Sequence, residues 1–154
     1  MYPKPYIEFL AHFHGTRDYF ECHEVLEAHW KSVDPKNRAS VWVTLIQIAV
    51  AMYHDRRGNQ KGALTLINRC INRVPDLKNE IDELGIDSDV LFQRLAGIRE
   101  RLEERKPYRS WNFPIVSLDV SKEAQLLCQQ WRVAYGSPSN LADQSLVLKH
   151  KYRR

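Results

Sequence analysis

The sequence is poor in cysteine, and its three cysteines form no Cys-x-x-Cys pair. An odd number of scattered cysteines offers neither a disulfide framework nor a cysteine-based zinc site. Cys22 and Cys70 fall in apolar helical patterns, where a cysteine serves as a small core residue. This pattern is typical of reduced thiols, and we expect a cytoplasmic protein.

Long hydrophobic runs are also missing. The longest apolar stretch, residues 41–53, is interrupted by Thr44 and Gln47 and is too short to span a bilayer. The N-terminus opens on prolines and lacks a basic start followed by an apolar stretch, so we expect no signal peptide. The sequence thus predicts no membrane segment.

Neither sign of charge dominates, since 23 basic residues face 19 acidic ones for a net charge of +4. Much of the excess lies in residues 149–154, and a basic end of this kind is more often a solvated terminus than a nucleic-acid site. Further basic positions, from Arg56 and Arg57 to Lys61, Arg69 and Arg73, come with no recognised DNA- or RNA-binding motif. Weak nucleic-acid binding therefore remains only a second alternative.

Apolar residues recur at helical spacing along most of the chain, which predicts an all-α fold. The pattern places helices over about 6–13, 19–33, 34–57, 60–74 and 88–102, and a last one from Ser121 to Gly136. The helix expected to start at Asp34-Pro35 is apolar nearly all round from Val41 onward, which is typical of a central helix. We predict a compact bundle of about five to six helices, with antiparallel hairpins around that central helix.

The length and the apolar content of 44% are those of one domain with a substantial core. We assign it to residues 1–136. Residues 107–120 are rich in aromatics and prolines without a helical period, which predicts a strap over the core, or less often a binding loop. Residues 137–154 are polar and basic and are expected to be flexible.

The most unusual feature is the polar content of the predicted helix 19–33. His23 and Glu27 fall inside its apolar arc, one turn apart, and Glu24 lies at the edge. A buried carboxylate needs a partner. The central helix carries Gln47 and His54 two turns apart, so we predict that the two polar sets meet in a buried cluster between the helices.

The segment Tyr19-Phe20-Glu21-x-His23-Glu24-x-Leu26-Glu27-x-x-Trp30 resembles the signature of the domain-of-unknown-function 309 family. Residues 45–54, followed by Arg57-Gly58-Asn59 and Gly62-Ala63-Leu64, resemble the family's next motif, and residues 84–87 resemble a third. The similarity covers about residues 6–102, in order and at matching spacing. It implies a small helical bundle with no established reaction, so the enzyme question stays open.

Three interpretations of the cluster compete. In the first, His23, Glu27 and His54 bind a divalent metal ion for a hydrolase or oxidase reaction, and Glu24 either hydrogen-bonds to these ligands or acts as general base. The pattern matches known bundle metal sites only in part, and it is not the zinc-protease motif because position 27 is Glu instead of His. In the second, a buried Glu beside a His acts as a metal-free acid–base pair, although no nucleophile is well placed.

The third interpretation is a structural network in which His23, Glu24 and Glu27 hydrogen-bond to groups nearby and fix the packing of two helices. The expected partners are Gln47, His54, Trp30, a tyrosine and backbone groups. The protein would then be an interaction module that binds a protein partner or forms a homodimer. We favour this interpretation, with the metal-binding bundle as its alternative.

Overall fold

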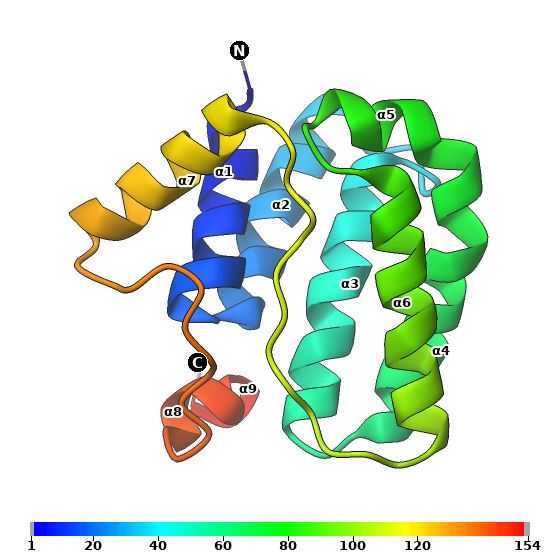
Figure 1. Ribbon diagram of the computed structural model, residues 1–154, viewed down its shortest axis with the longest axis vertical. Helices are drawn as coiled ribbons and strands as arrows, with labels where there is room; N and C mark the ends of the chain where they lie inside the picture. The colour runs from blue at the N-terminus through cyan, green and yellow to red at the C-terminus, as the bar shows by residue number, and fades with distance from the viewer. Residues whose placement is uncertain (1, 153–154) are drawn as a thin grey trace.

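The computed structural model describes residues 2–152, and this part of the chain is built from helices packed around one core (Figure 1). The helices are α1 (Lys4–Ala11), the π-helical turn η1 (His12–Thr16), α2 (Tyr19–Val33), α3 (Val41–Arg56), α4 (Gln60–Arg73), the 3₁₀ turn η2 (Val74–Leu77), α5 (Lys78–Glu83), α6 (Ser88–Glu103), α7 (Leu118–Gln130), α8 (Gln144–Val147) and α9 (Lys149–Tyr152). The predicted all-α class is confirmed.

Most of these helices begin at a side chain that caps the free backbone N–H groups of the first turn. Asp18 accepts from the backbone N–H of Glu21 at the start of α2, and Asn59 accepts from that of Gly62 at the start of α4. Asp87 caps α6 in the same way. Local chemistry therefore sets the boundaries of these helices.

The predicted start of the central helix was wrong. Asp34 ends α2, because its backbone leaves the helical region with a φ of −157° and a ψ of 52°, and residues 34–40 form turns. Ser40 caps α3 instead by accepting from the N–H of Val43. Asp34 and Pro35 are residue types that often start a helix. Here they follow the last turn of α2 and begin the turns that lead to α3.

Helix α3 is central, as predicted, and packs against both α2 and α4, while α4 packs against α6 (Figure 1). Its buried residues surround most of the helix. None of the helices in the described part of the chain is both long and apolar enough to cross a membrane. All three cysteines are free and buried, which confirms Cys22 and Cys70 as core residues.

After α6 the chain runs back across the bundle as an extended segment, residues 106–116, which we call the strap (Figure 1). Phe113 is buried against the rings of Phe9 and Phe13. The strap thus covers one side of α1, α2 and α3, as its aromatic content predicted.

The end of the strap runs close beside Gly85. This residue has a φ of 80°, and a Cβ placed on it would lie 2.6 Å from the Cβ of Ser117. The Gly85 carbonyl accepts from the backbone N–H of Val116. Only glycine fits this combination of left-handed backbone and close approach.

The last long helix begins earlier than predicted. Ser117, four residues before the expected cap at Ser121, accepts from the N–H of Val120. The helix also ends at Gln130, before the expected stop at Gly136. Both serines are N-cap residue types, and the contact between Ser117 and Gly85 decides between them.

Candidate functional site

The polar residues singled out on α2 lie at the border of its buried side. The buried line of this helix is Tyr19, Cys22, Leu26 and Trp30. The side chains of His23, Glu24 and Glu27 remain 32%, 37% and 33% exposed. The prediction of a buried cluster was therefore wrong, because His23 and Glu27 lie one helical position of 100° from the buried line, Glu24 lies further from it, and all three side chains stay hydrated.

These three side chains form a network within α2. His23 Nε2 lies 2.9 Å from Glu27 Oε2, and His23 Nδ1 lies 3.7 Å from Glu24 Oε1. The other oxygen of Glu27, Oε1, is 3.1 Å from Lys31 Nζ. The contacts of Glu27 with His23 and with Lys31 join residues one turn apart, so they stabilise the helix itself.

The two polar residues of α3 lie apart from that network. His54 accepts hydrogen bonds at Nδ1 from Arg57 Nη2 at 3.0 Å and Asn59 Nδ2 at 3.5 Å, at the end of the helix. Burial, with a smaller effect of Arg57, lowers the pKa of His54. Gln47 borders a hollow of about 460 Å³ between α3 and α4 that Arg38, Arg69 and Arg73 help to line.

Aromatic rings fill the space between His23 and His54. The Phe20 ring lies 6.2 Å from that of His23 and 5.9 Å from that of Tyr53, and Tyr53 lies 6.2 Å from His54. Within residues 2–152, no three His, Cys, Asp or Glu side chains are grouped so that they could hold a metal ion. The structure therefore brings His23, Glu24 and Glu27 together but not His54 or Gln47.

Trp30, the remaining residue of the predicted network, is buried and makes its polar contacts with the turn that follows α2. Its Nε1 donates to the carbonyl of Asn37 at 3.1 Å, and the guanidinium of Arg38 lies 5.8 Å from its ring centroid. This side chain fixes the turn that follows α2.

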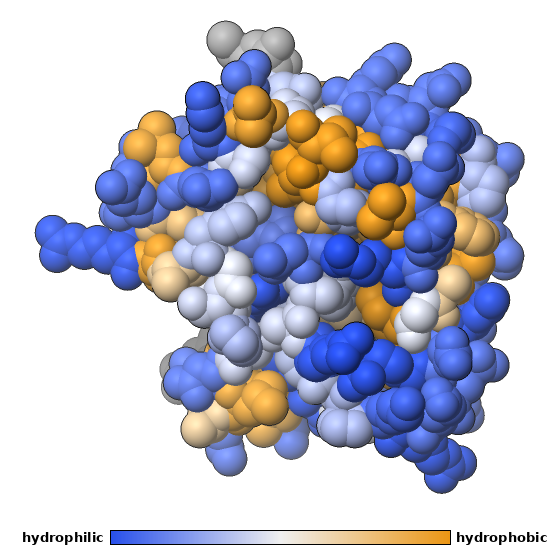
Figure 2. Space-filling model, viewed as in Figure 1, coloured by the Kyte–Doolittle hydropathy of each residue, from blue (hydrophilic) through white to orange (hydrophobic). Residues whose placement is uncertain are grey.

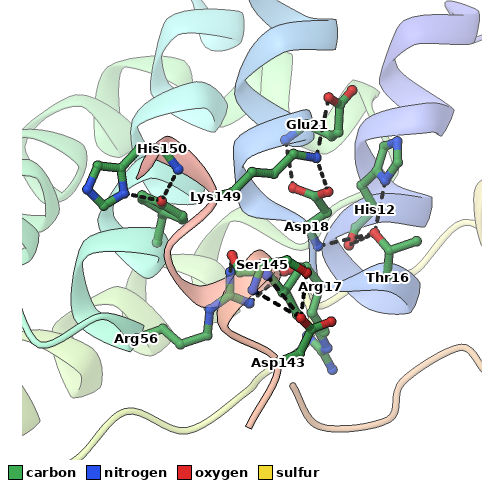
Figure 3. A network of polar contacts seen from close by, with 12 residues as sticks. His12, Thr16, Arg17, Asp18, Glu21, Arg56, Asp143, Ser145, Lys149 and His150 are labelled. Carbon is green, nitrogen blue, oxygen red and sulfur yellow. Dashed lines mark hydrogen bonds and ion pairs between the residues drawn. The ribbon is translucent and has the colours of Figure 1, made fainter. Parts of the chain in front are cut away.

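A larger polar network, which the sequence did not indicate, connects the bundle to the C-terminal segment (Figure 3). Arg17 is buried with a φ of 55°, and its guanidinium donates to the carbonyls of Phe13, Trp111 and Ser137 and to Asn112 Oδ1. One side chain thus ties η1 to the strap and to the chain beyond α7.

Arg56 continues this network from α3. Its guanidinium lies 4.5 Å from the ring centroid of Tyr19 and donates to the carbonyl of Arg17 at 2.6 Å and to Ser139 Oγ at 3.2 Å. It also donates to the carbonyl of Leu146 at 3.4 Å. No sequence pattern indicated this role, because an arginine at the end of a helix is usually solvated.

Helix α9 completes the network (Figure 3). Lys149 Nζ lies 2.5 Å from Asp18 Oδ2 and 3.6 Å from Glu21 Oε1. The backbone N–H of His150 donates to the Tyr53 hydroxyl at 2.8 Å, and the His150 ring is hydrogen-bonded to the same hydroxyl. The flexibility expected for residues 137–154 stays a prediction, but the described part of this segment makes specific contacts with α2 and α3.

Comparison with known proteins gives two matches. The family model described as "Domain of unknown function (DUF309)" matches residues 6–66. The uncharacterized protein YpuF of Bacillus subtilis (strain 168) is 39% identical over 153 residues, which are 99% of this chain and 88% of that protein. No solved structure gives a significant match.

Proposed function

The chain belongs to the DUF309 family, and from that premise we propose that it is an interaction module that pairs with a second copy of itself through one face of α2 and α3. We define the α2–α3 face as Phe20, His23, Glu24 and Glu27 of α2 with Val43, Gln47, Val50 and His54 of α3. The three free cysteines support action in the cytoplasm.

The observation that carries this proposal is a half-exposed stripe on an otherwise covered helix. Val43, Gln47, Val50 and His54 follow one another at intervals of four, three and four residues, and all four are half-buried. Met52, on the other side of α3, is buried and accepts at Sδ from Trp111 Nε1 of the strap. The strap thus covers one side of the central helix and leaves the opposite side partly open.

The α2–α3 face has opposite charges at its two edges. The α2 side carries the carboxylates of Glu24 and Glu27, with Lys31 beside Glu27. On the α4 side, Arg69 and Arg73 line the hollow beside Gln47. These two arginines are one turn apart on α4, and like charges at this spacing repel each other.

A twofold axis that lies in the plane of this face and runs parallel to α3 would place each acidic edge opposite the basic edge of the second copy. The apolar side chains of Val43 and Val50 would meet near the axis. Symmetric homodimers are the commonest assemblies of soluble proteins, and they require a self-complementary surface of this kind. In this arrangement the His23–Glu27 network is structural and presents the Glu24 carboxylate toward the partner.

The proposal is tested by sedimentation velocity over about 1 to 100 µM, the range in which weak interfaces associate. We expect a concentration-dependent dimer of the wild-type chain. Val50→Lys should shift the protein to monomer, because a charge would then lie at the apolar centre of the interface.

The matched control is Leu126→Lys, which adds the same charge at an exposed leucine of α7. This variant should dimerise like the wild type, and circular dichroism should show that both variants are folded. A wild-type chain that stays monomeric throughout the range would contradict the proposal, as would equal dimerisation of the two variants.

A further inference from the structure

A cavity of about 430 Å³ lies on the strap side of α3, away from the α2–α3 face. Its walls are contributed by α3, α6 and the first half of the strap. On the side of the molecule shown in Figure 2, strongly hydrophilic residues gather over α6 and the strap. The volume falls within the range of small-molecule sites.

Asp55 is the acidic group that α3 contributes to this cavity. Its Oδ1 is buried and makes no hydrogen bond in the described part of the chain. Burial raises the pKa of Asp55 to about 6, although Arg101 acts in the opposite direction. A buried carboxylate oxygen without a partner is costly for a folded protein, and such costs concentrate at functional sites.

A second wall, from α6 and the strap, is basic and held in place. Arg94 Nη1 donates to the Asn112 carbonyl at 2.8 Å, and Arg101 Nη2 donates to the Pro107 carbonyl at 2.9 Å. Each guanidinium keeps further N–H groups beyond the one used to hold the strap. Arg109 and Lys106 add positive charge at the same wall, against Glu100 and Glu104.

The remaining wall is apolar and includes an indole. Trp111 Nε1 donates to Met52 Sδ at 2.9 Å, which fixes the ring, and Val90, Ile98 and Leu102 line the cavity beside it. An immobilised indole offers a flat apolar surface for stacking against a planar heterocycle. The three walls are therefore an acceptor, a set of phosphate-binding donors and a stacking surface.

We propose that this cavity binds a nucleoside monophosphate, with Asp55 accepting from the N–H groups of the base and the arginines of α6 and the strap binding the phosphate. Arginine and phosphate form strong charge-assisted hydrogen bonds. Among the common bases, guanine presents two adjacent N–H donors to a carboxylate, and the buried Oδ1 of Asp55 would turn toward the cavity to accept the second of them. We therefore expect GMP to bind more tightly than AMP, CMP or UMP.

This binding site is independent of the proposed pairing of two copies, because none of the residues of the α2–α3 face lines the cavity. A monomeric protein would bind the nucleotide equally well. The nucleotide experiment can therefore succeed or fail whatever the outcome for the dimer.

Isothermal titration calorimetry of the full chain with GMP, guanosine and inorganic phosphate tests the proposal. GMP should bind, and each of the two fragments should bind at least about tenfold more weakly because it lacks one set of contacts. Asp55→Asn should weaken GMP by about tenfold or more, because an amide replaces the carboxylate that accepts from the base.

Arg109→Gln separates the two ends of the ligand. Arg109 is exposed on the strap, so the variant should fold normally, weaken GMP and leave guanosine binding unchanged. The matched controls are Asp119→Asn and Arg132→Gln, which change exposed residues outside the cavity and should bind GMP like the wild type.

Three results would overturn the proposal. The first is that GMP does not bind the wild-type chain. The second is that inorganic phosphate binds as tightly as GMP, which would make the wall a general anion site. The third is that Asp55→Asn binds GMP with unchanged affinity while remaining folded.

Discussion

At the scale of single residues, His14 is a titratable group that the fold holds in one charge state. It is fully buried, its Nδ1 lies 2.8 Å from the Leu10 carbonyl, and its Nε2 accepts from the backbone N–H of Phe113 at 2.9 Å. This arrangement suits a neutral ring with its proton on Nδ1. Burial is the largest effect and lowers the pKa of His14 to about 4.

Acidification should therefore destabilise the protein through His14. Its folded pKa of about 4 lies below the unfolded value of 6.5, so its contribution is complete above pH 6.5 and is lost as the pH falls toward 4. The loss amounts to about 3 kcal/mol in the free energy of unfolding. Urea unfolding between these pH values measures it.

The comparison variant is His14→Gln, whose amide can donate and accept without titrating. It should lose this part of the pH dependence, whereas His29→Gln, on the half-exposed side of α2, should retain it. Identical slopes for the wild type and His14→Gln would show that the ring is not held neutral by the fold.

Asp55 should have the opposite effect on stability. Its folded pKa of about 6 lies above its ordinary value of 3.8, so ionisation of the carboxyl group destabilises the folded protein. Its contribution is highest below pH 4 and is lost as the pH rises to about 6. The other charges facing the cavity are those of Arg94, Arg101, Lys106, Arg109, Glu100 and Glu104.

Asp55→Asn should therefore make the free protein more stable than the wild type at pH 7 and remove the advantage at pH 4. Urea unfolding at both pH values measures the difference, with Asp119→Asn as the exposed control. A variant less stable than the wild type at pH 7 would indicate that the carboxylate has a partner in the fold.

At the scale of elements, the helices that follow strong local signals were predicted well. Asn59 caps α4, Asp87 caps α6, and the all-round apolar pattern of α3 identified the central helix. The boundary errors arose where two residues could each serve as the cap. Ser117 was chosen over Ser121 by its contact with Gly85, a residue distant in sequence, and the local pattern cannot show such a contact.

The junction of η1, the strap and the chain after α7 depends on Arg17. Arg17→Ala would remove hydrogen bonds to three carbonyls and leave Phe13 and Trp111 carbonyls without this donor. The expected cost is about 3 kcal/mol or more in the free energy of unfolding. Thermal and urea unfolding measure it.

Arg132→Ala is the matched control, because Arg132 also has a positive φ, of 60°, but is exposed. It should change stability by less than about 0.5 kcal/mol, as is usual for exposed positions. Similar losses in the two variants would mean that the left-handed backbone, and not the guanidinium contacts, explains the effect of Arg17.

At the scale of the whole molecule, the sequence identified part of the candidate site. The helical wheel and the family motif both indicated His23, Glu24 and Glu27, and these side chains do interact. Their exposure was missed, because a wheel assigns direction only to within one position and cannot show which neighbour covers a helix. The roles of Arg17, Arg56 and Asp55 depend on the strap and the C-terminal segment, whose positions a local pattern does not specify.

The charges at the edges of the α2–α3 face offer a test of the whole assembly. Glu24→Arg should weaken the proposed dimer, and Arg73→Glu should weaken it as well, because each places like charges opposite one another. A chain with both changes should recover dimerisation, since the twofold axis brings the exchanged charges together again. Sedimentation velocity compares the three variants.

Failure of the doubly substituted chain to recover would show that these two edges do not face each other. Lower stability of the single variants cannot imitate the recovery, because two independent destabilising changes would add.

Oxidative cross-linking tests the central claim, that two copies meet through the α2–α3 face, most directly. Val50→Cys places an accessible thiol close to the proposed axis, and the three native cysteines are buried. The account predicts rapid formation of a disulfide-linked dimer by Val50→Cys and little by Leu126→Cys, an exposed position on α7. Equal rates for the two variants, or no linked dimer of Val50→Cys, would contradict it.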